Sequence, residues 1–183
     1  MHGIVIFGTN YGSTQKYARR VADRLGFECI DYHWADKDRL NKYDVIVYGG
    51  GLYAGRTVGL AKTLRKITDI DSKHIFIFTV GLADPLVEKN VQNIRESLKR
   101  QIPKNAYRED RIFHFRGGIN YNSLNTKHKF MMATLNMILK RMPKEKQTDE
   151  TKAMIDTYKG EVEFIDYNSI DPLCESVLGL NQE

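Results

Sequence analysis

The apolar run at residues 74–79 (His-Ile-Phe-Ile-Phe-Thr) constrains the fold of this chain more than any other stretch. A nearly unbroken apolar run of this length predicts a strand buried on both faces, which is the environment of strands in a parallel sheet. Stretches at residues 3–7, 27–32, 43–48 and 111–116 predict four more strands. A parallel sheet needs crossover connections, so helices are expected between these strands.

Segments with helical spacing of apolar residues separate the strands. The first lies between Gly12 and Gly26, and others lie at residues 58–67 and 85–102, the last with Pro85 in its first turn. This alternation predicts an α/β domain with a doubly wound parallel sheet. A ligand of such a sheet binds beyond the carboxyl ends of the strands, where the winding reverses. Those ends are the loops at residues 9–14, 49–55, 79–84 and 117–121.

After residue 118 the chain leaves this alternation. A long helix is expected at residues 125–142, with one apolar stripe formed by Met131, Leu135, Ile138 and Met142. A strand-like segment follows at residues 162–167, and a final helix with Pro172 in its first turn completes the core. We therefore expect one domain spanning residues 1–183, with an insertion at about residues 119–160 near the fifth strand.

Composition narrows the class of protein. A length of 183 residues, 42% hydrophobic and 28% charged, is ordinary for a globular domain. No secretory signal opens the chain, and the most apolar helical stretch, residues 130–139, is about half of the ~20 residues that span a bilayer, so we expect a cytosolic protein. Cys29 and Cys174 lie far apart without a C-x-x-C spacing, which argues against an iron–sulfur or zinc site. The net charge of +5 admits nucleic acid, an anionic membrane surface or an anionic ligand.

The polar turn at residues 8–14 (Gly-Thr-Asn-Tyr-Gly-Ser-Thr) lies between the first strand and the first helix. The hydroxyls of Thr9, Ser13 and Thr14 can donate to phosphate oxygens, and the following helix offers unpaired N–H groups at the positive end of its dipole. This pattern predicts an anion site. A helix cap without a ligand remains the alternative, because Ser and Thr are common before any helix.

The same turn resembles the phosphate loop of flavodoxins, although that family more often has Thr or Ser where Tyr11 stands. Residues 49–55 resemble the loop that passes one face of the flavin ring, with Tyr53 at the position of the usual aromatic residue. Residues 79–84 lie where the family covers the other side of the ring. The resemblance implies a flavodoxin-like fold, a five-stranded parallel sheet of order 2-1-3-4-5, and FMN as the cofactor.

By that resemblance, three loops would hold FMN. Their residues are Thr9, Asn10, Tyr11, Gly12, Ser13 and Thr14, then Gly50, Gly51, Leu52, Tyr53, Ala54 and Gly55, and finally Thr79, Val80, Gly81, Leu82 and Asp84. A flat, mostly apolar ring gains by stacking on Tyr53 while backbone groups pair with its polar edge. The alternatives are a flexible turn at residues 49–51 and a partly buried surface aromatic at Tyr53. No catalytic side chain and no metal site are expected, because the flavin carries the chemistry.

The part of the chain after about residue 115 resembles a second group of proteins. Phe-Arg-Gly-Gly-Ile-Asn-Tyr (115–121), the helix ending in Leu-Lys-Arg-Met (139–142), Thr-Asp-Glu-Thr-Lys (148–152) and Glu-Val-Glu-Phe (161–164) are similar to flavodoxin-type protoporphyrinogen oxidases. Those FMN enzymes pass electrons from a reduced tetrapyrrole to a quinone at the membrane in haem biosynthesis. The resemblance implies an oxidoreductase of this type with tetrapyrrole and quinone substrates and no nucleic-acid partner.

The long helix itself has two interpretations. Its apolar stripe would pack on the sheet, as most such stripes do. A methionine-rich face with basic ends also suits a membrane surface, so peripheral contact with the inner face of the membrane stays open. Its cations would meet lipid phosphates or substrate propionates, or face solvent; they are Lys127, Lys129, Lys140 and Arg141. His114 and His128 are expected to be structural or exposed.

Two other functions stay open at this point. One is a non-catalytic electron carrier that donates to a redox partner protein, and the other is a small FMN-dependent quinone reductase. Flavodoxin carriers tend to be acidic, so the net charge of +5 points away from the carrier.

Overall fold

A computed structural model describes residues 2–53, 55–120, 126–147, 149–156, 158 and 160–180 of the chain. Its central sheet has five parallel strands: β1 (Gly3–Gly8), β2 (Glu28–Asp31), β3 (Val45–Tyr53), β5 (His74–Gly81) and β6 (Ile112–Arg116). They are ordered β2-β1-β3-β5-β6. Numbered among themselves, the parallel strands have the order 2-1-3-4-5, so the predicted flavodoxin-like α/β fold is confirmed.

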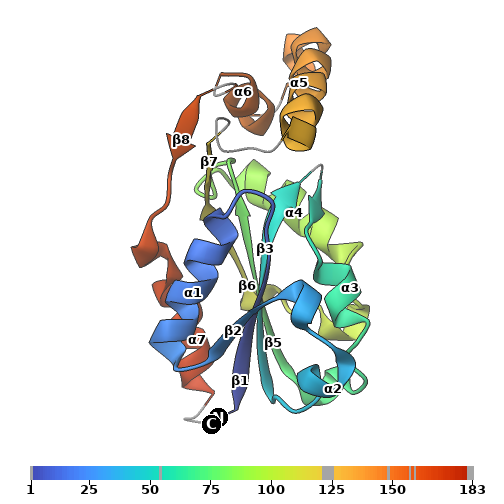
Figure 1. Cartoon of the computed structure of the whole chain (residues 1–183), viewed down its shortest axis with the longest axis vertical. Coiled ribbons are helices and arrows are strands. Elements are labelled where there is room, and N and C mark those ends of the chain that lie inside the picture. The colour runs from blue at the N-terminus through green and yellow to red at the C-terminus, as the bar shows by residue number, and fades with distance from the viewer. Residues whose placement is uncertain are drawn as a thin grey trace.

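Helices cover both faces of this sheet (Figure 1). One face carries α1 (Ser13–Leu25) and α7 (Asp171–Gly179), and the other carries α2 (Lys37–Leu40), α3 (Leu60–Leu64) and α4 (Glu88–Lys99). Short 3-10 helices complete the connections: η1 (Tyr32–Trp34), η2 (Ile70–Ser72), η3 (Lys104–Ala106), η4 (Glu109–Arg111), η6 (Lys144–Lys146) and η7 (Tyr167–Ile170).

Successive strand residues alternate between two hydrophobic clusters, as the pleat of a strand requires. In β5, Phe76 and Phe78 pack towards α1 and α7, whereas Ile77 packs towards α3 and α4. All three side chains are at most 2% exposed. The strand is therefore buried on both faces, as its unbroken apolar run predicted.

The final helix completes the core as expected. Leu173, Cys174 and Val177 of α7 are fully buried in the cluster on the α1 side of the sheet. Pro172 lies in the first turn of α7, where its missing N–H costs no helical hydrogen bond.

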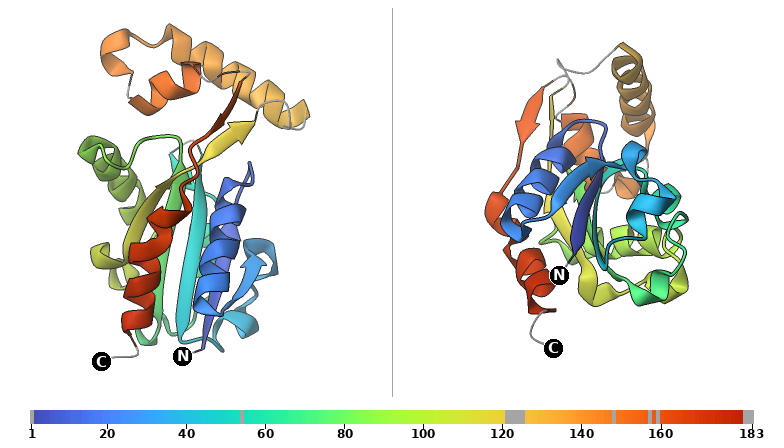
Figure 2. Two further views of the ribbon diagram at one scale, coloured as in Figure 1. Left: turned by 90° about the vertical axis from the view of Figure 1, so that its left-hand side faces the viewer. Right: turned by 60° about the horizontal axis from the view of Figure 1, so that its bottom comes forward.

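Beyond β6 the chain forms a separate layer. β7 (Gly118–Asn120) and β8 (Glu161–Glu163) pair antiparallel, and α5 (Thr126–Arg141) and α6 (Asp149–Asp156) lie between them in sequence. Figures 1 and 2 show these elements beyond the carboxyl ends of the parallel strands, whereas both chain termini lie at the other end. Residues 119–160, called the insertion below, thus lie at the end of the sheet where a ligand is expected.

The apolar stripe predicted for the long helix is wrong at Ile138, which is 54% exposed. The buried side of α5 instead contains Met132, at 2% exposure, and Leu139, at 9%. The side chains of Met131 and Leu135 lie outside those described. The Met132 side of the helix faces the first loop, where Tyr11 donates its phenol proton to Met132 Sδ at 3.3 Å.

The predicted loop after the third strand is also wrong in part, because β3 continues to Tyr53 and then turns back into the short strand β4 (Arg56–Thr57). A flexible turn at residues 49–51 is excluded, since these residues pair in register with β5. Their glycines are required by packing: a Cβ at Gly49 would lie 2.1 Å from the Phe78 ring.

Pro85 does not open a helix as predicted, because α4 begins only at Glu88. The Asp84 carboxylate accepts a hydrogen bond from Leu86 N at 2.9 Å, and Asp84 O accepts one from Val87 N at 3.2 Å. These bonds form a turn that holds Pro85 outside the helix.

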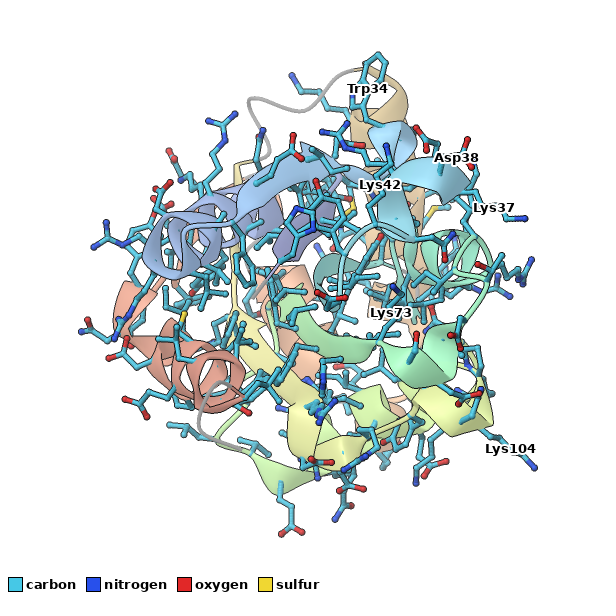
Figure 3. The ribbon with its side chains drawn as sticks, turned by 90° about the horizontal axis from the view of Figure 1, so that it is seen from below. Trp34, Lys37, Asp38, Lys42, Lys73 and Lys104 are labelled. Atoms are coloured by element: carbon cyan, nitrogen blue, oxygen red, sulfur yellow. The ribbon has the colours of Figure 1, made fainter. Side chains whose placement is uncertain are left out.

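The end of the sheet that holds the termini carries charges of both signs. Figure 3, seen from this end, labels Lys37, Asp38, Lys42, Lys73 and Lys104 among its side chains. This mixed surface lies opposite the insertion and provides sites for control variants.

Candidate functional site

A cleft of about 560 Å³ opens at the carboxyl ends of the parallel strands. Its lining comes from four segments of the chain: Thr9, Asn10, Tyr11, Ser13 and Thr14 after β1; Gly51, Leu52, Tyr53 and Val58 around β3 and β4; Val80, Gly81 and Leu82 at β5; and Gly117 and Gly118 after β6. The cleft is therefore where the winding of the sheet predicts a ligand.

The first loop forms the start of α1 without a side-chain cap. Gly12 occupies the cap position with a left-handed backbone (φ 90°), and Thr9 Oγ1 accepts a hydrogen bond from its N–H at 2.9 Å. Ser13 and Thr14 lie inside the first turn of the helix. A cap-only role for their hydroxyls is thereby excluded. The uncapped N–H groups of this turn and the positive end of the helix dipole face the cleft, which suits an anion.

The two hydroxyls of this turn are used differently. Ser13 Oγ donates to Gly118 O and accepts from Gly118 N, both at 3.0 Å. The only proton of the Ser13 hydroxyl is therefore used in the hydrogen bond to Gly118 O of β7. Thr14 is 2% exposed, lines the cleft and makes no hydrogen bond with its hydroxyl among the described residues. Thr14 is consequently the free hydroxyl donor of the pair.

The second loop supplies an aromatic wall. Tyr53 lies at the end of β3, and its ring centroid is 6.3 Å from that of Tyr11, with an interplanar angle of 60°. Gly51 keeps the space between this wall and the first loop open, because a Cβ there would lie 3.1 Å from Thr14 Oγ1. An aromatic wall beside an open, glycine-lined slot suits a flat ring.

Val58 belongs to the site but escaped sequence analysis, which placed it at the start of the helix expected at residues 58–67; that helix, α3, begins only at Leu60. The Tyr48 hydroxyl, buried beneath the sheet end, donates to Val58 O at 2.7 Å and holds it in place. Burial raises the pKa of Tyr48 strongly, so this phenol remains a donor.

The third loop contributes Val80 and Gly81 from the end of β5, followed by Leu82. Gly117 N donates to Gly81 O at 2.7 Å, which joins this loop to the segment after β6. Gly117 and Gly118 lie within the expected loop at residues 117–121 but were not predicted as cofactor residues. Sequence analysis could have included them, because both follow directly after a predicted parallel strand.

Several predicted cofactor residues do not line the cleft. Thr79 faces α4 instead and is 1% exposed, since it alternates with Val80 along the strand. Gly50 packs against Thr57, while Gly12 and Gly55 provide left-handed backbone turns. Asp84 supports the third loop from behind, as its bond to Leu86 shows. Ala54 lies outside the described residues.

The polar partner of Thr79 is His114 of β6, whose Nδ1 lies 2.7 Å from Thr79 Oγ1. Burial, reinforced by the positive charge of Arg95, lowers the pKa of His114 to about 4. This histidine is neutral at physiological pH and belongs to the layer beneath the cleft. The structural role expected for it agrees with this position.

The lining of the cleft contains no ionised side chain within the described residues. A bound phosphate would therefore be held by backbone N–H groups, the Thr14 hydroxyl and the α1 dipole rather than by Arg or Lys. Together with the Tyr53 wall, these features fit the phosphate and the ring of FMN.

Comparison with known proteins agrees with this geometry. A family model described as "Flavodoxin domain" matches residues 4–149, more than half of the chain. An uncharacterized protein of Methanocaldococcus jannaschii is 25% identical over 138 residues, covering 68% of this chain and 89% of that protein.

Solved structures include flavodoxins with low sequence identity to this chain. Flavodoxin 1 from Bacillus cereus is 17% identical with a TM-score of 0.42, covering 63% of this chain and 84% of its own. Flavodoxin 2 from the same organism is 13% identical with a TM-score of 0.46, covering 85% and 94%. The extent of the family match decides the assignment: the chain belongs to the flavodoxin domain family, a family of flavoproteins, and its cofactor is FMN.

Proposed function

We propose that the protein is an FMN-dependent oxidoreductase of the protoporphyrinogen dehydrogenase type, which passes electrons from the porphyrinogen to a quinone. The observation that carries this proposal is the position of the insertion. Its helix α5 contacts the first cofactor loop through Tyr11 and Met132, so added structure lies directly beside the cleft. An electron carrier needs no such addition, whereas an enzyme needs a place for its substrate.

The residues of the cleft bind and orient, and FMN supplies the redox centre. The first turn of α1 and Thr14 would hold the phosphate. Tyr53 and the backbone of Gly81 would flank the ring. For each pair of electrons, two protons also leave the porphyrinogen, and the quinone becomes a quinol.

The surface of α5 suits both proposed substrates. Met137 and Ile138 are about half exposed, and the cations Lys140 and Arg141 follow them on the exposed side of the helix. A tetrapyrrole combines a large apolar ring with anionic propionates, and a quinone resides in a bilayer whose headgroups can be anionic. Apolar residues beside cations complement either one.

Contact with a membrane would be peripheral in this proposal. Within the described residues, no helix has the length and apolar character needed to cross a bilayer. Binding would then rest on a few apolar side chains and cations, and high salt would weaken it.

The experiment combines an absorbance spectrum with an assay. The purified protein should show flavin absorbance and release FMN, and with a quinone acceptor it should oxidise protoporphyrinogen IX faster than the uncatalysed reaction. A protein that holds FMN but oxidises no porphyrinogen would contradict the proposal. If it instead exchanges electrons with a redox protein, it is a carrier; rapid reduction of quinone by a nicotinamide cofactor would identify a quinone reductase.

A charge variant tests the role of α5. The double variant K140Q/R141Q should raise the KM for the porphyrinogen by about tenfold, since two charge-assisted contacts are lost. Its matched control is K42Q/K104Q, which removes two cations at the opposite end of the molecule (Figure 3). Equal kinetics of the two double variants would contradict substrate binding at α5.

A further inference from the structure

The guanidinium of Arg116 connects the third cofactor loop to the chain that returns from the insertion. Its Nε donates to Leu82 O at 3.3 Å, and one terminal nitrogen lies 3.5 Å from Asp84 Oδ2. Its Cζ lies 3.8 Å from the centroid of the Phe164 ring, directly after β8. One side chain thus contacts two segments that are about 80 residues apart in sequence.

The backbone around Arg116 is fixed from both sides. The Tyr17 hydroxyl donates to Arg116 O at 2.8 Å and accepts from Asp166 N at 2.9 Å. Phe164 N donates to Gly117 O at 3.3 Å. The Tyr17 side chain is fully buried, so the packing around it fixes the place of its hydroxyl. The return segment therefore has a defined position against the end of β6.

Only arginine can make this set of contacts. Its planar group stacks on an aromatic ring with its face while its edge donates in the same plane. A lysine ammonium is compact and strongly hydrated, so it would keep the charge near Asp84 but lose the combined stacking and directed donation. Substitution of Arg116 by lysine therefore keeps the positive charge but removes the planar group, so it tests the two contributions separately.

We propose that Arg116 is a positioning residue that couples FMN binding in the cleft to the docking of the insertion. The inference rests on the proposed function only in requiring that FMN binds in the cleft. Leu82 lines the cleft, and Phe164 lies directly after β8 in the segment that returns from the insertion, so a ligand that orders the third loop also orders the contact with Phe164. Thermodynamic linkage makes the effect reciprocal: FMN should stabilise the docked insertion by the factor by which docking tightens FMN.

The first measurement uses the wild-type chain. Trypsin should cleave the insertion at exposed sites such as Lys140 and Arg141 several times more slowly when FMN is saturating. The N-terminal half of the chain, cleaved at sites such as Lys42, serves as the internal reference. Equal protection of both regions, or none of the insertion, would overturn the coupling.

The second measurement is the affinity for FMN, followed by quenching of flavin fluorescence. R116Q should weaken FMN binding about tenfold and abolish its protection of the insertion, and R116K should restore little of either. F164A should weaken FMN binding by a similar factor although Phe164 does not line the cleft. The matched control is R111Q, which removes an arginine stacked 5.2 Å from the Phe76 centroid at the far end of β6 and should leave FMN affinity unchanged.

A double-variant cycle separates coupling from general damage. R116Q/F164A should bind FMN about as well as R116Q, because both changes break one contact, whereas independent structural damage would multiply the two losses. Wild-type affinity in R116Q and F164A, or multiplied losses in the double variant, would overturn the inference and leave FMN binding intact. A wild-type chain that binds no FMN would overturn the cofactor assignment as well.

Discussion

The cofactor end of the sheet and the insertion differ in how they are held. Strands β1, β3 and β5 reach the cleft through ladders of parallel pairs and two buried hydrophobic clusters. The insertion attaches through the β7 and β8 pair and a few side-chain contacts, and its helix α5 leaves Met137 and Ile138 about half exposed. The difference teaches that the cleft is built by the packed core itself, whereas the insertion is joined to that core through one strand pair and a few side chains.

The largest expected contrast between the two regions is in stability. L173A, in the fully buried face of α7, should lower the free energy of unfolding by about 4 kcal/mol, because it opens a cavity in the core. L139A, on the buried side of α5, should affect global unfolding by less than about 1 kcal/mol and expose mainly the insertion to protease. Urea unfolding followed by circular dichroism measures both. Equal losses would show that the insertion is part of the core.

The free energy of unfolding should also depend on pH through a buried residue of the central sheet, His114. The unfolded chain protonates His114 near pH 6.5, but the folded chain does so only near pH 4. Between these values the unfolded state binds more protons, so the free energy of unfolding falls as the pH falls, by up to about 3 kcal/mol from this group.

The test compares urea unfolding at pH 7 and pH 4. H114Q should lose that part of the pH dependence, while H74Q, at the exposed start of β5, should retain it. Wild-type pH dependence in H114Q would show that His114 is accessible in the folded state.

Next in size is the effect of the free hydroxyl in the phosphate loop. T14V should weaken FMN binding about 30-fold, roughly 2 kcal/mol, by removing a donor to a charged group. T57V is the matched control: its hydroxyl is buried without a partner among the described residues, and it does not line the cleft. S13A should affect FMN less than T14V, since its proton is given to Gly118. An unchanged affinity in T14V would exclude the hydroxyl from phosphate binding.

The smallest expected effect concerns the contact between the regions. Y11F removes the hydrogen bond to Met132 Sδ and should loosen α5 by about 0.5 kcal/mol, as sulfur is a weak acceptor. Hydrogen exchange of α5 should quicken slightly while FMN affinity stays unchanged. A large loss of FMN in Y11F would mean that the phenol itself binds the cofactor.

The sequence predicted the parallel sheet and a polar turn at the edge of the cleft because both depend on local patterns. The run at residues 74–79 reports burial directly, and the turn before α1 has its chemistry in adjacent residues. The predictions failed where distant residues decide. Gly49 belongs to a strand because it pairs with β1 and β5, and Thr79 faces away from the cleft by strand register. Ile138 is exposed because α5 packs through Met132.

The most direct test of this division replaces residues 121–160 by Asn-Gly. Asn120 and Glu161 are paired in antiparallel register, so a two-residue turn can join β7 to β8 while keeping Arg116 and Phe164 in contact. The shortened protein should bind FMN within about threefold of the full chain and should no longer oxidise protoporphyrinogen with a quinone. Loss of FMN binding, or retention of full porphyrinogen oxidation, would contradict the separation of cofactor and substrate regions.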